Sequence, residues 1–162
     1  MQSKGNSVLL SASDLVGHLN CRYLTSLDLK VAGGLLAKPS VWDPVLEVLA
    51  ERGRKHEQDY LDHLQALGLT IVKIEGTGVD DTAVSQTINA MNAGVPVIAQ
   101  AALKAGQWLG RADVLLRVEK PSALGAWSYE VVDTKLTQET KGSTVLQPCL
   151  YSDLLTMPRV RG

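Results

Sequence analysis

The sequence contains no phenylalanine, and aromatic residues make up only 4% of its 162 residues, so leucine and valine must build most of any core. It also lacks a large excess of either charge, because the formal net charge is -1. A surface that attracts nucleic acid over its whole area is therefore excluded, and any such site must be a local patch. With 45% apolar and 20% charged residues, the composition excludes global disorder, and the length suits one domain.

Cysteine is equally scarce. Cys21 and Cys149 are the two cysteines, and no CxxC pair is present, so neither a disulfide framework nor a complete cysteine metal site can form. No apolar run reaches the roughly 18–20 residues that a membrane span needs. The first residues also lack the apolar stretch and cleavage site of a signal peptide. These absences predict a protein of the reducing cytoplasm with no membrane partner.

Capping residues and apolar spacing predict two helices in the first part of the chain. One begins near Ser13 and ends at the glycine pair that follows residue 32. In the other, Asp43 can cap the first turn, Pro44 suits position N1, and Gly68 ends the helix. The residues expected to face the interior are Leu15, Leu19, Tyr23 and Leu27 in the first helix, and Leu49, His56, Tyr60 and Leu67 in the second.

The rest of the chain alternates between strand and helix patterns. Strands are expected at 69–74, 95–103, 108–118 and 127–136, with helices over 80–93 and from Ser143 onward. This order predicts an α/β fold with a central mixed sheet flanked by helices. We expect a single domain over residues 1–162, with a helical part at about 10–68 and a core that carries the candidate catalytic residues at about 69–157.

The last expected strand ends in two charged residues. Side chains alternate between faces along the segment YEVVDTKL, so Asp133 and Lys135 share a face with Tyr129 and Val131. Burying a charge costs free energy unless the charge is paired or bound to a metal. An ion pair between Asp133 and Lys135 is one explanation.

A metal site is the other explanation, because Asp113 lies on the neighbouring strand in the segment GRADVL. Two carboxylates at one point repel each other unless a cation lies between them, and hard oxygen ligands select Mg²⁺ or Mn²⁺. Lys135 can then hold a water molecule or an anionic phosphate, which suits attack on a phosphodiester. His56 as a further ligand favours Mn²⁺, although a histidine on an apolar stripe is, taken alone, more often a core residue.

Four segments, in this order, resemble the motifs of the PD-(D/E)XK nucleases and of their RecB-like branch in particular. GRKH at 53–56 resembles the Gly-x-x-His helix of that branch, and GRADVL resembles its motif with the first aspartate. DTK at 133–135 and QPCLY at 147–151 resemble the (D/E)XK and QxxxY motifs. The resemblance covers roughly residues 10–155. Within the branch, the chain is similar to the RecB-like nuclease domain found at the N-terminus of large bacterial helicase-nuclease proteins.

The resemblance implies a role for each matching residue. Asp113 and Asp133 would bind the metal ion, with His56 as a third ligand and the carbonyl group of Thr134 as a fourth. Lys135 would position the attacking water and stabilise charge on the phosphate. Gln147 and Tyr151, one helical turn apart, would help to hold DNA or the catalytic lysine.

The resemblance also implies a restriction-endonuclease-like core, with DNA as the substrate and a helicase domain or subunit as a partner. Relatives usually continue with a further strand and helix, so a core truncated at its C-terminus is expected. Some relatives carry an iron–sulfur cluster, and Cys21 resembles its early cysteine. The late trio of cysteines has no counterpart, so this chain alone is not expected to hold such a cluster.

These patterns predict a metal-dependent DNA nuclease domain that acts on single strands or ends, as part of a helicase-nuclease or DNA repair system. Two alternatives stay open. One is a non-catalytic nucleic-acid-binding module of the same fold. The other is a metal-dependent phosphoesterase for small substrates.

Overall fold

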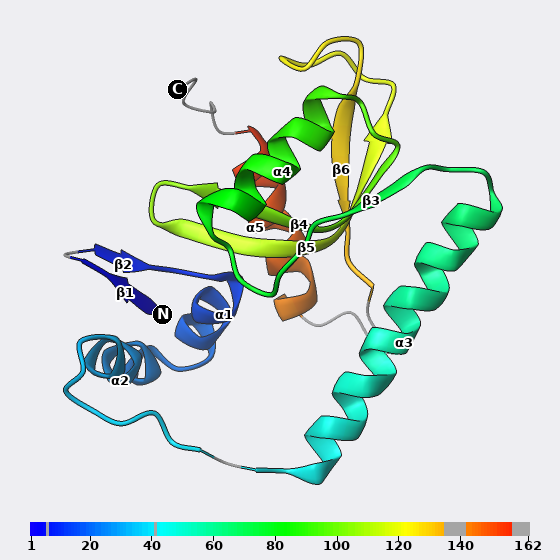
Figure 1. Ribbon diagram of the computed structural model, residues 1–162. Helices are drawn as coiled ribbons and strands as arrows, with labels where there is room; N and C mark the ends of the chain where they lie inside the picture. Colours follow the sequence, from blue (N-terminus) through cyan, green and yellow to red (C-terminus); the bar gives the residue numbers. More distant parts are fainter. Residues whose placement is uncertain (6, 41, 135–141, 157–162) are drawn as a thin grey trace.

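A four-stranded mixed sheet with helices on both faces forms the centre of the molecule (Figure 1). The structure is a computed structural model that describes residues 1–5, 7–40, 42–134 and 142–156. In chain order the elements are β1 (Gln2–Lys4), β2 (Ser7–Leu9), α1 (Ala12–Asn20), α2 (Arg22–Ala32), α3 (Pro44–Ala66), β3 (Ile71–Lys73), α4 (Asp81–Asn92), β4 (Val97–Ala105), β5 (Trp108–Val118), β6 (Ser128–Val132) and α5 (Gly142–Thr156). None of the described helices is long and apolar enough to cross a membrane.

The order of strands in the sheet is β3-β4-β5-β6. The pair β3–β4 is parallel, whereas β4–β5 and β5–β6 are antiparallel. A tight turn joins β4 to β5, and its Gly106 has a φ of 55°, a conformation that glycine adopts at little cost. The α/β class, the mixed sheet and the extent of β5 agree with the expectation from the sequence.

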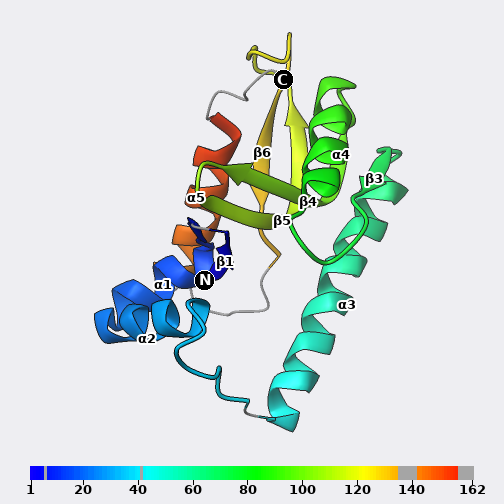
Figure 2. The same cartoon turned by 60° about the vertical axis from the view of Figure 1, so that its left-hand side comes forward.

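The two faces of the sheet are covered by different helices (Figure 2). On one face, Leu61 and Leu64 of α3 pack against the alternating residues Val97, Ala99 and Val114. The other face is covered by α4 and α5, and α1 also contributes to that cluster. The residues of the larger cluster include Ala12, Ala83, Met91, Ile98, Leu115, Tyr129, Tyr151 and Leu154.

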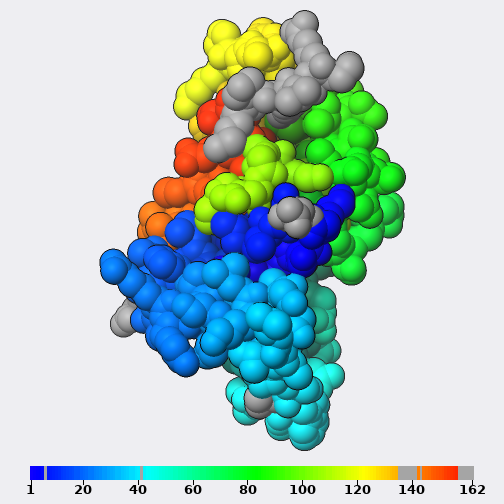
Figure 3. All heavy atoms as spheres, turned by 90° about the vertical axis from the view of Figure 1, so that its left-hand side faces the viewer, coloured from blue at the N-terminus to red at the C-terminus, as the bar shows by residue number. Residues whose placement is uncertain are grey.

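The N-terminal hairpin of β1 and β2 was not expected from the sequence, because each strand has only three residues. The hairpin leads into Leu10. The amide of Leu10 donates to the backbone carbonyl of Gln107, and its carbonyl accepts from the amide of Leu109. The start of the chain therefore lies against the tip of the β4–β5 hairpin, as the space-filling view shows (Figure 3).

The prediction of one helix from Ser13 to the glycine pair is wrong. Two helices, α1 and α2, meet at Cys21, whose φ of -156° and ψ of 103° are extended rather than helical. The helix begins earlier than expected because Ser11 is its cap and forms a capping box with Asp14. The expected inward stripe is interrupted at this break. Leu19 and Tyr23, on either side of it, are exposed, whereas Leu15 and Leu27 are half-buried.

The predicted inward stripe of α3 is correct at Tyr60 and wrong at its other three positions. Leu49 and Leu67 are 53% and 64% exposed, and His56 is exposed as well. The helix instead turns Glu57, Tyr60, Leu61 and Leu64 toward the sheet, at the spacing i, i+3, i+4 and i+7. Its first half extends beyond the sheet (Figure 1), so apolar residues there, such as Val45, Leu46 and Val48, stay exposed.

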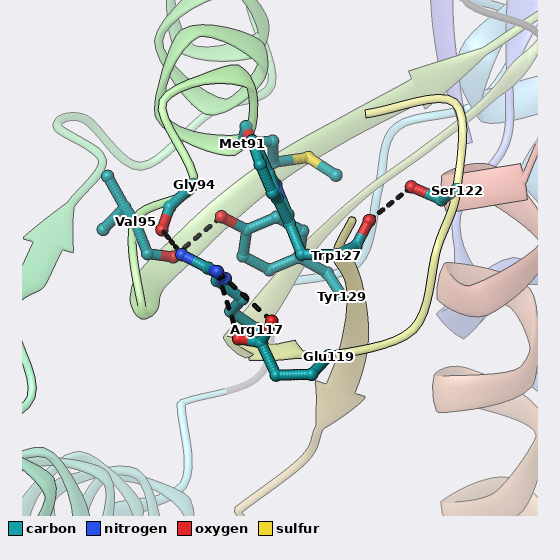
Figure 4. A network of polar contacts seen from close by, with 8 residues as sticks. All are labelled: Met91, Gly94, Val95, Arg117, Glu119, Ser122, Trp127 and Tyr129. Carbon is teal, nitrogen blue, oxygen red and sulfur yellow. Dashed lines mark hydrogen bonds and ion pairs between the residues drawn. The ribbon is translucent and has the colours of Figure 1, made fainter. Parts of the chain in front are cut away.

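A network of polar contacts joins the end of α4 to the far end of the β5–β6 pair (Figure 4). Arg117 donates to the carbonyl of Gly94 at 3.0 Å and lies 4.9 Å above the ring of Trp127. The indole of Trp127 donates to the carbonyl of Met91, and the hydroxyl of Tyr129 donates to that of Val95. These donors hold the last turn of α4 and the residues that follow it against the β5–β6 pair.

Candidate functional site

The register of β5 and β6 brings Asp113 and Asp133 opposite each other. Val114 pairs with Val132, and one further step along both strands leads to the two aspartates. The Cα atoms of residues opposite each other in an antiparallel pair lie about 4.5–5.5 Å apart. Both aspartates are half-buried, and Oδ2 of Asp133 is a fully buried oxygen.

Asp113 is oriented by the residue that follows Asp133. The amide and the hydroxyl of Thr134 donate to Oδ2 of Asp113, at 3.0 and 3.1 Å. These hydrogen bonds hold the segment after β6 against β5. Both hydrogen bonds are to Oδ2 of Asp113. Among the described residues, none donates a hydrogen bond to its Oδ1 and none forms an ion pair with this side chain. Thr134 thus contacts the site through its amide and hydroxyl.

Helix α5 brings Tyr151 within range of the charges of both aspartates. Burial raises the pKa of the Tyr151 phenol above its usual range, a hydrogen bond from Gln147 opposes this rise, and the charges of Asp113 and Asp133 add to it. The Nε2 atom of Gln147 lies 3.4 Å from the Tyr151 hydroxyl. Pro148 lies inside α5, and the helix continues through it with this one-turn pair in place. Tyr151 is therefore a neutral hydrogen-bonding group at neutral pH.

Gly110 makes the position of Tyr151 possible. A Cβ atom at Gly110 would lie 2.2 Å from Cε1 of Tyr151, far closer than atoms can approach. The tyrosine ring thus rests directly on the backbone of β5, three residues before Asp113. The sequence analysis assigned no role to this glycine. A signal for it exists, because a glycine inside a strand often marks a close approach.

His56 is a predicted site residue that faces away from this group. The exposed side chain of His56 contradicts its expected inward direction. In the described part of the chain, no three His, Cys, Asp or Glu side chains gather closely enough to hold a metal ion. Lys135 lies outside the described residues.

Arg111 lies on the same strand as Asp113, but its side chain stabilises the fold and is not part of the candidate site. Its guanidinium donates to the carbonyls of Ile74 at 2.7 Å, Gly78 at 2.8 Å and Glu75 at 3.4 Å. Burial lowers the pKa of Arg111, and the charge of Asp80 opposes this change. Its donors therefore fasten the segment between β3 and α4 to the sheet.

The pair Asp113 and Asp133 fits a small divalent cation. Mg²⁺ is usually held by one or two carboxylates, with waters and substrate phosphates as its other ligands. Like charges directly opposite each other destabilise a strand pair, at a cost of about 1–4 kcal/mol near 4 Å. A cation between the two side chains would remove this repulsion. This donor set does not require His56.

Comparisons with models of protein families, with curated proteins and with solved structures gave no match.

Proposed function

We propose that this chain is a metal-dependent nuclease domain that hydrolyses phosphodiester bonds of DNA, on single strands or at ends. In this proposal the sheet and its helices form a restriction-endonuclease-like core of the RecB-like type. A helicase domain or subunit in a repair system is the partner that the sequence resemblance implies.

One observation carries the proposal. Asp113, Asp133 and Tyr151 belong to three of the motif segments, which lie 20 and 18 residues apart in the sequence. The register of β5 and β6 leads from the pair Val114–Val132 to the two aspartates, and the Tyr151 ring packs on Gly110 of β5, within range of both their charges. A chance occurrence of an Asp-x-Lys segment would not bring the tyrosine of a QxxxY segment to the same point. The shared location therefore supports the reading of these segments as parts of one site.

Each residue of the candidate site would have its own role in the hydrolysis. When bound, a divalent cation would supply positive charge to the phosphate and lower the pKa of a water molecule. Asp113 and Asp133 would hold the cation, and Thr134 keeps Asp113 in place. Lys135 would orient the water that attacks phosphorus and would stabilise the developing negative charge. Water adds to phosphorus, the P–O bond to the leaving nucleotide breaks, and that oxygen takes a proton.

The test uses DNA labelled at one end, as single strands and as duplex, with Mg²⁺, Mn²⁺ or EDTA. We expect cleavage by the wild type with either metal, none with EDTA and none by Asp133→Asn. Glu130→Gln is the matched control, because Glu130 lies three residues before Asp133, is exposed and pairs with Lys120 on the surface. This variant should cleave like the wild type.

Two results would redirect the proposal. DNA binding without cleavage under every condition would favour the non-catalytic module. Hydrolysis of bis(p-nitrophenyl) phosphate without cleavage of DNA would favour the phosphoesterase for small substrates. Equal cleavage by Asp133→Asn and the wild type would remove the aspartate pair from the reaction.

A further inference from the structure

The first half of α3 carries apolar residues that no described part of the chain covers. Residues 44–52 are all exposed, and Val45, Leu46 and Leu49 are 61%, 60% and 53% exposed. Neither of the hydrophobic clusters formed by the described residues includes a residue of this half, and Figures 1 and 2 show it extending beyond the sheet. A contiguous exposed apolar surface of this kind typically marks an interaction site.

The exposed residues continue the stripe with which α3 packs on the sheet. In the second half of the helix, Glu57, Leu61 and Leu64 face the sheet. Leu46 and Ala50 precede Glu57 by eleven and seven residues, which is close to three and two helical turns. They therefore lie on the same side of the helix. One continuous stripe is covered by the sheet in the second half and uncovered in the first.

The charges beside the uncovered stripe suit a second copy of the same helix. Glu47 and Arg54 lie on one flank of the stripe, seven residues and thus about two turns apart. Both side chains are exposed, and neither forms an ion pair with a described residue. If two such helices pack antiparallel about a twofold axis midway between these positions, each glutamate meets the arginine of the other copy. The surface is then self-complementary, as a twofold interface requires.

This position of the axis also matches the extent of the uncovered half. With the axis between residues 50 and 51, residue 44 of one helix lies level with residue 57 of the other. Because α3 begins at Pro44, the two helices overlap over residues 44–57. Their sheet-covered halves then lie at opposite ends of the pair, so the two sheets do not compete with the contact.

We propose that the first half of α3 is a dimerisation surface, and that its occupant is the same segment of a second copy packed antiparallel. Leu46 and Leu49 of both copies leave water in this contact, and the two Glu47–Arg54 pairs fix its direction and register. A parallel pair would instead place Glu47 against the flank that carries Leu49, where it finds no cation. This inference does not depend on the proposed nuclease activity.

The experiment measures the dimer dissociation constant by sedimentation equilibrium, over protein concentrations of about 1–100 μM. Glu47→Arg and Arg54→Glu each turn both pairs into like-charge contacts, so each should weaken the dimer by about tenfold. The double variant restores opposite charges and should return to wild-type affinity. A mixture of the two single variants should form a heterodimer as tightly as the wild type forms its dimer, because both of its pairs are again opposite in charge.

Two further variants separate the surface from the fold. Replacing Leu46 and Leu49 together by glutamine should weaken the dimer by a hundredfold or more, because each copy loses buried apolar area. Both leucines are exposed in the single chain, so its circular dichroism spectrum should not change. Lys55→Glu is the matched control for Arg54→Glu, because Lys55 is exposed and lies on the side of α3 opposite the stripe. It should dimerise like the wild type.

Three outcomes would overturn the inference. One is a wild type that stays monomeric at the highest concentration. Another is a dimer that the charge and leucine variants leave unchanged, because its interface then lies elsewhere. The third is a monomeric wild type whose leucine variant loses affinity for single-stranded DNA, which would assign the surface to nucleic acid. Each of these can occur with or without DNA cleavage, so the proposed function is tested separately.

Discussion

The two ends of the β5–β6 pair differ in how their charged residues are satisfied. At the end near α4, the cation Arg117 has a ring, a carbonyl and the carboxylate of Glu119 as its partners (Figure 4). At the other end, Asp113 receives hydrogen bonds from neutral groups of Thr134, and no described cation pairs with it. At the first end the charge of Arg117 is balanced within the chain, although its Nε atom is buried without a hydrogen-bond partner among the described residues. At the second end, the arrangement around Asp113 suits a bound cation.

Substitutions at the two ends of the β5–β6 pair should affect different properties, activity at the end with Asp113 and stability at the end with Arg117. Asp113→Asn should reduce cleavage by roughly a thousandfold, because several kcal/mol of charge stabilisation depend on the cation. Its melting temperature should not fall, since one of two repelling charges is removed. Arg117→Ala should keep activity and lose about 1–3 kcal/mol of stability. Cleavage assays measure the activity of the two variants, and thermal melts measure their stability. An Asp113→Asn variant that cleaves DNA like the wild type would contradict the functional difference between the two ends.

Lys135→Ala tests the residue that the resemblance adds to the aspartate end. We expect cleavage to fall by a hundredfold or more, roughly 3 kcal/mol, while Mn²⁺ binding stays within a few-fold of wild type. The reason is that the lysine acts on water and phosphate, whereas the carboxylates hold the ion. A variant that loses stability but cleaves normally would identify Lys135 as an ion-pair partner of the fold.

Metal should stabilise the protein through the aspartate end. A ligand that binds only the native state contributes about 2.7 kcal/mol at a hundredfold excess over its dissociation constant. We expect Mg²⁺ and Mn²⁺ to raise the melting temperature of the wild type and of Arg117→Ala but not of Asp113→Asn. The exposed position of His56 predicts that His56→Ala keeps the shift with Mg²⁺. A large loss in that variant would restore His56 as a ligand.

Gly110→Ala sharpens the comparison by disturbing the aspartate end without changing a charge. The added Cβ atom would collide with the Tyr151 ring, so α5 must shift, at a cost of about 1–3 kcal/mol. Gly53→Ala is the control, because its Cβ atom meets nothing within 4 Å in the interior of α3. That variant should gain up to about 1 kcal/mol. Urea denaturation measures both, and equal effects would refute the close contact.

The smallest expected effect concerns pH. Because the folded state raises the pKa of Tyr151 above its unfolded value of about 10, folding favours the protonated phenol. Stability from this group is fully present below about pH 10 and is lost as the pH rises through the folded pKa. The wild type should therefore lose stability between pH 9 and 11 more steeply than Tyr151→Phe does. Urea denaturation at the two pH values would detect this, and parallel curves would contradict it.

Local sequence patterns predicted the elements whose signals are complete within a few residues. β5 begins and ends as expected, and α4 lies within the predicted range, because alternation, caps and turn residues are local properties. The same patterns failed for α1 and α2, where Cys21 interrupts an apparently continuous helical stretch. Nothing in a helical spacing reveals one extended residue between two helices.

The sequence by itself determined the α/β class, the order of the elements from α3 to α5 and the identity of the candidate residues Asp113, Asp133 and Tyr151. Only the tertiary structure decided which residues meet. A helix of 23 residues is longer than the part of the sheet it covers, so periodicity could not show that α3 turns Glu57 inward and His56 outward. Strand register brought Asp113 and Asp133 to one end of the β5–β6 pair, and the bare backbone of Gly110 admitted Tyr151. Such contacts join distant segments, and a local pattern carries no information about them.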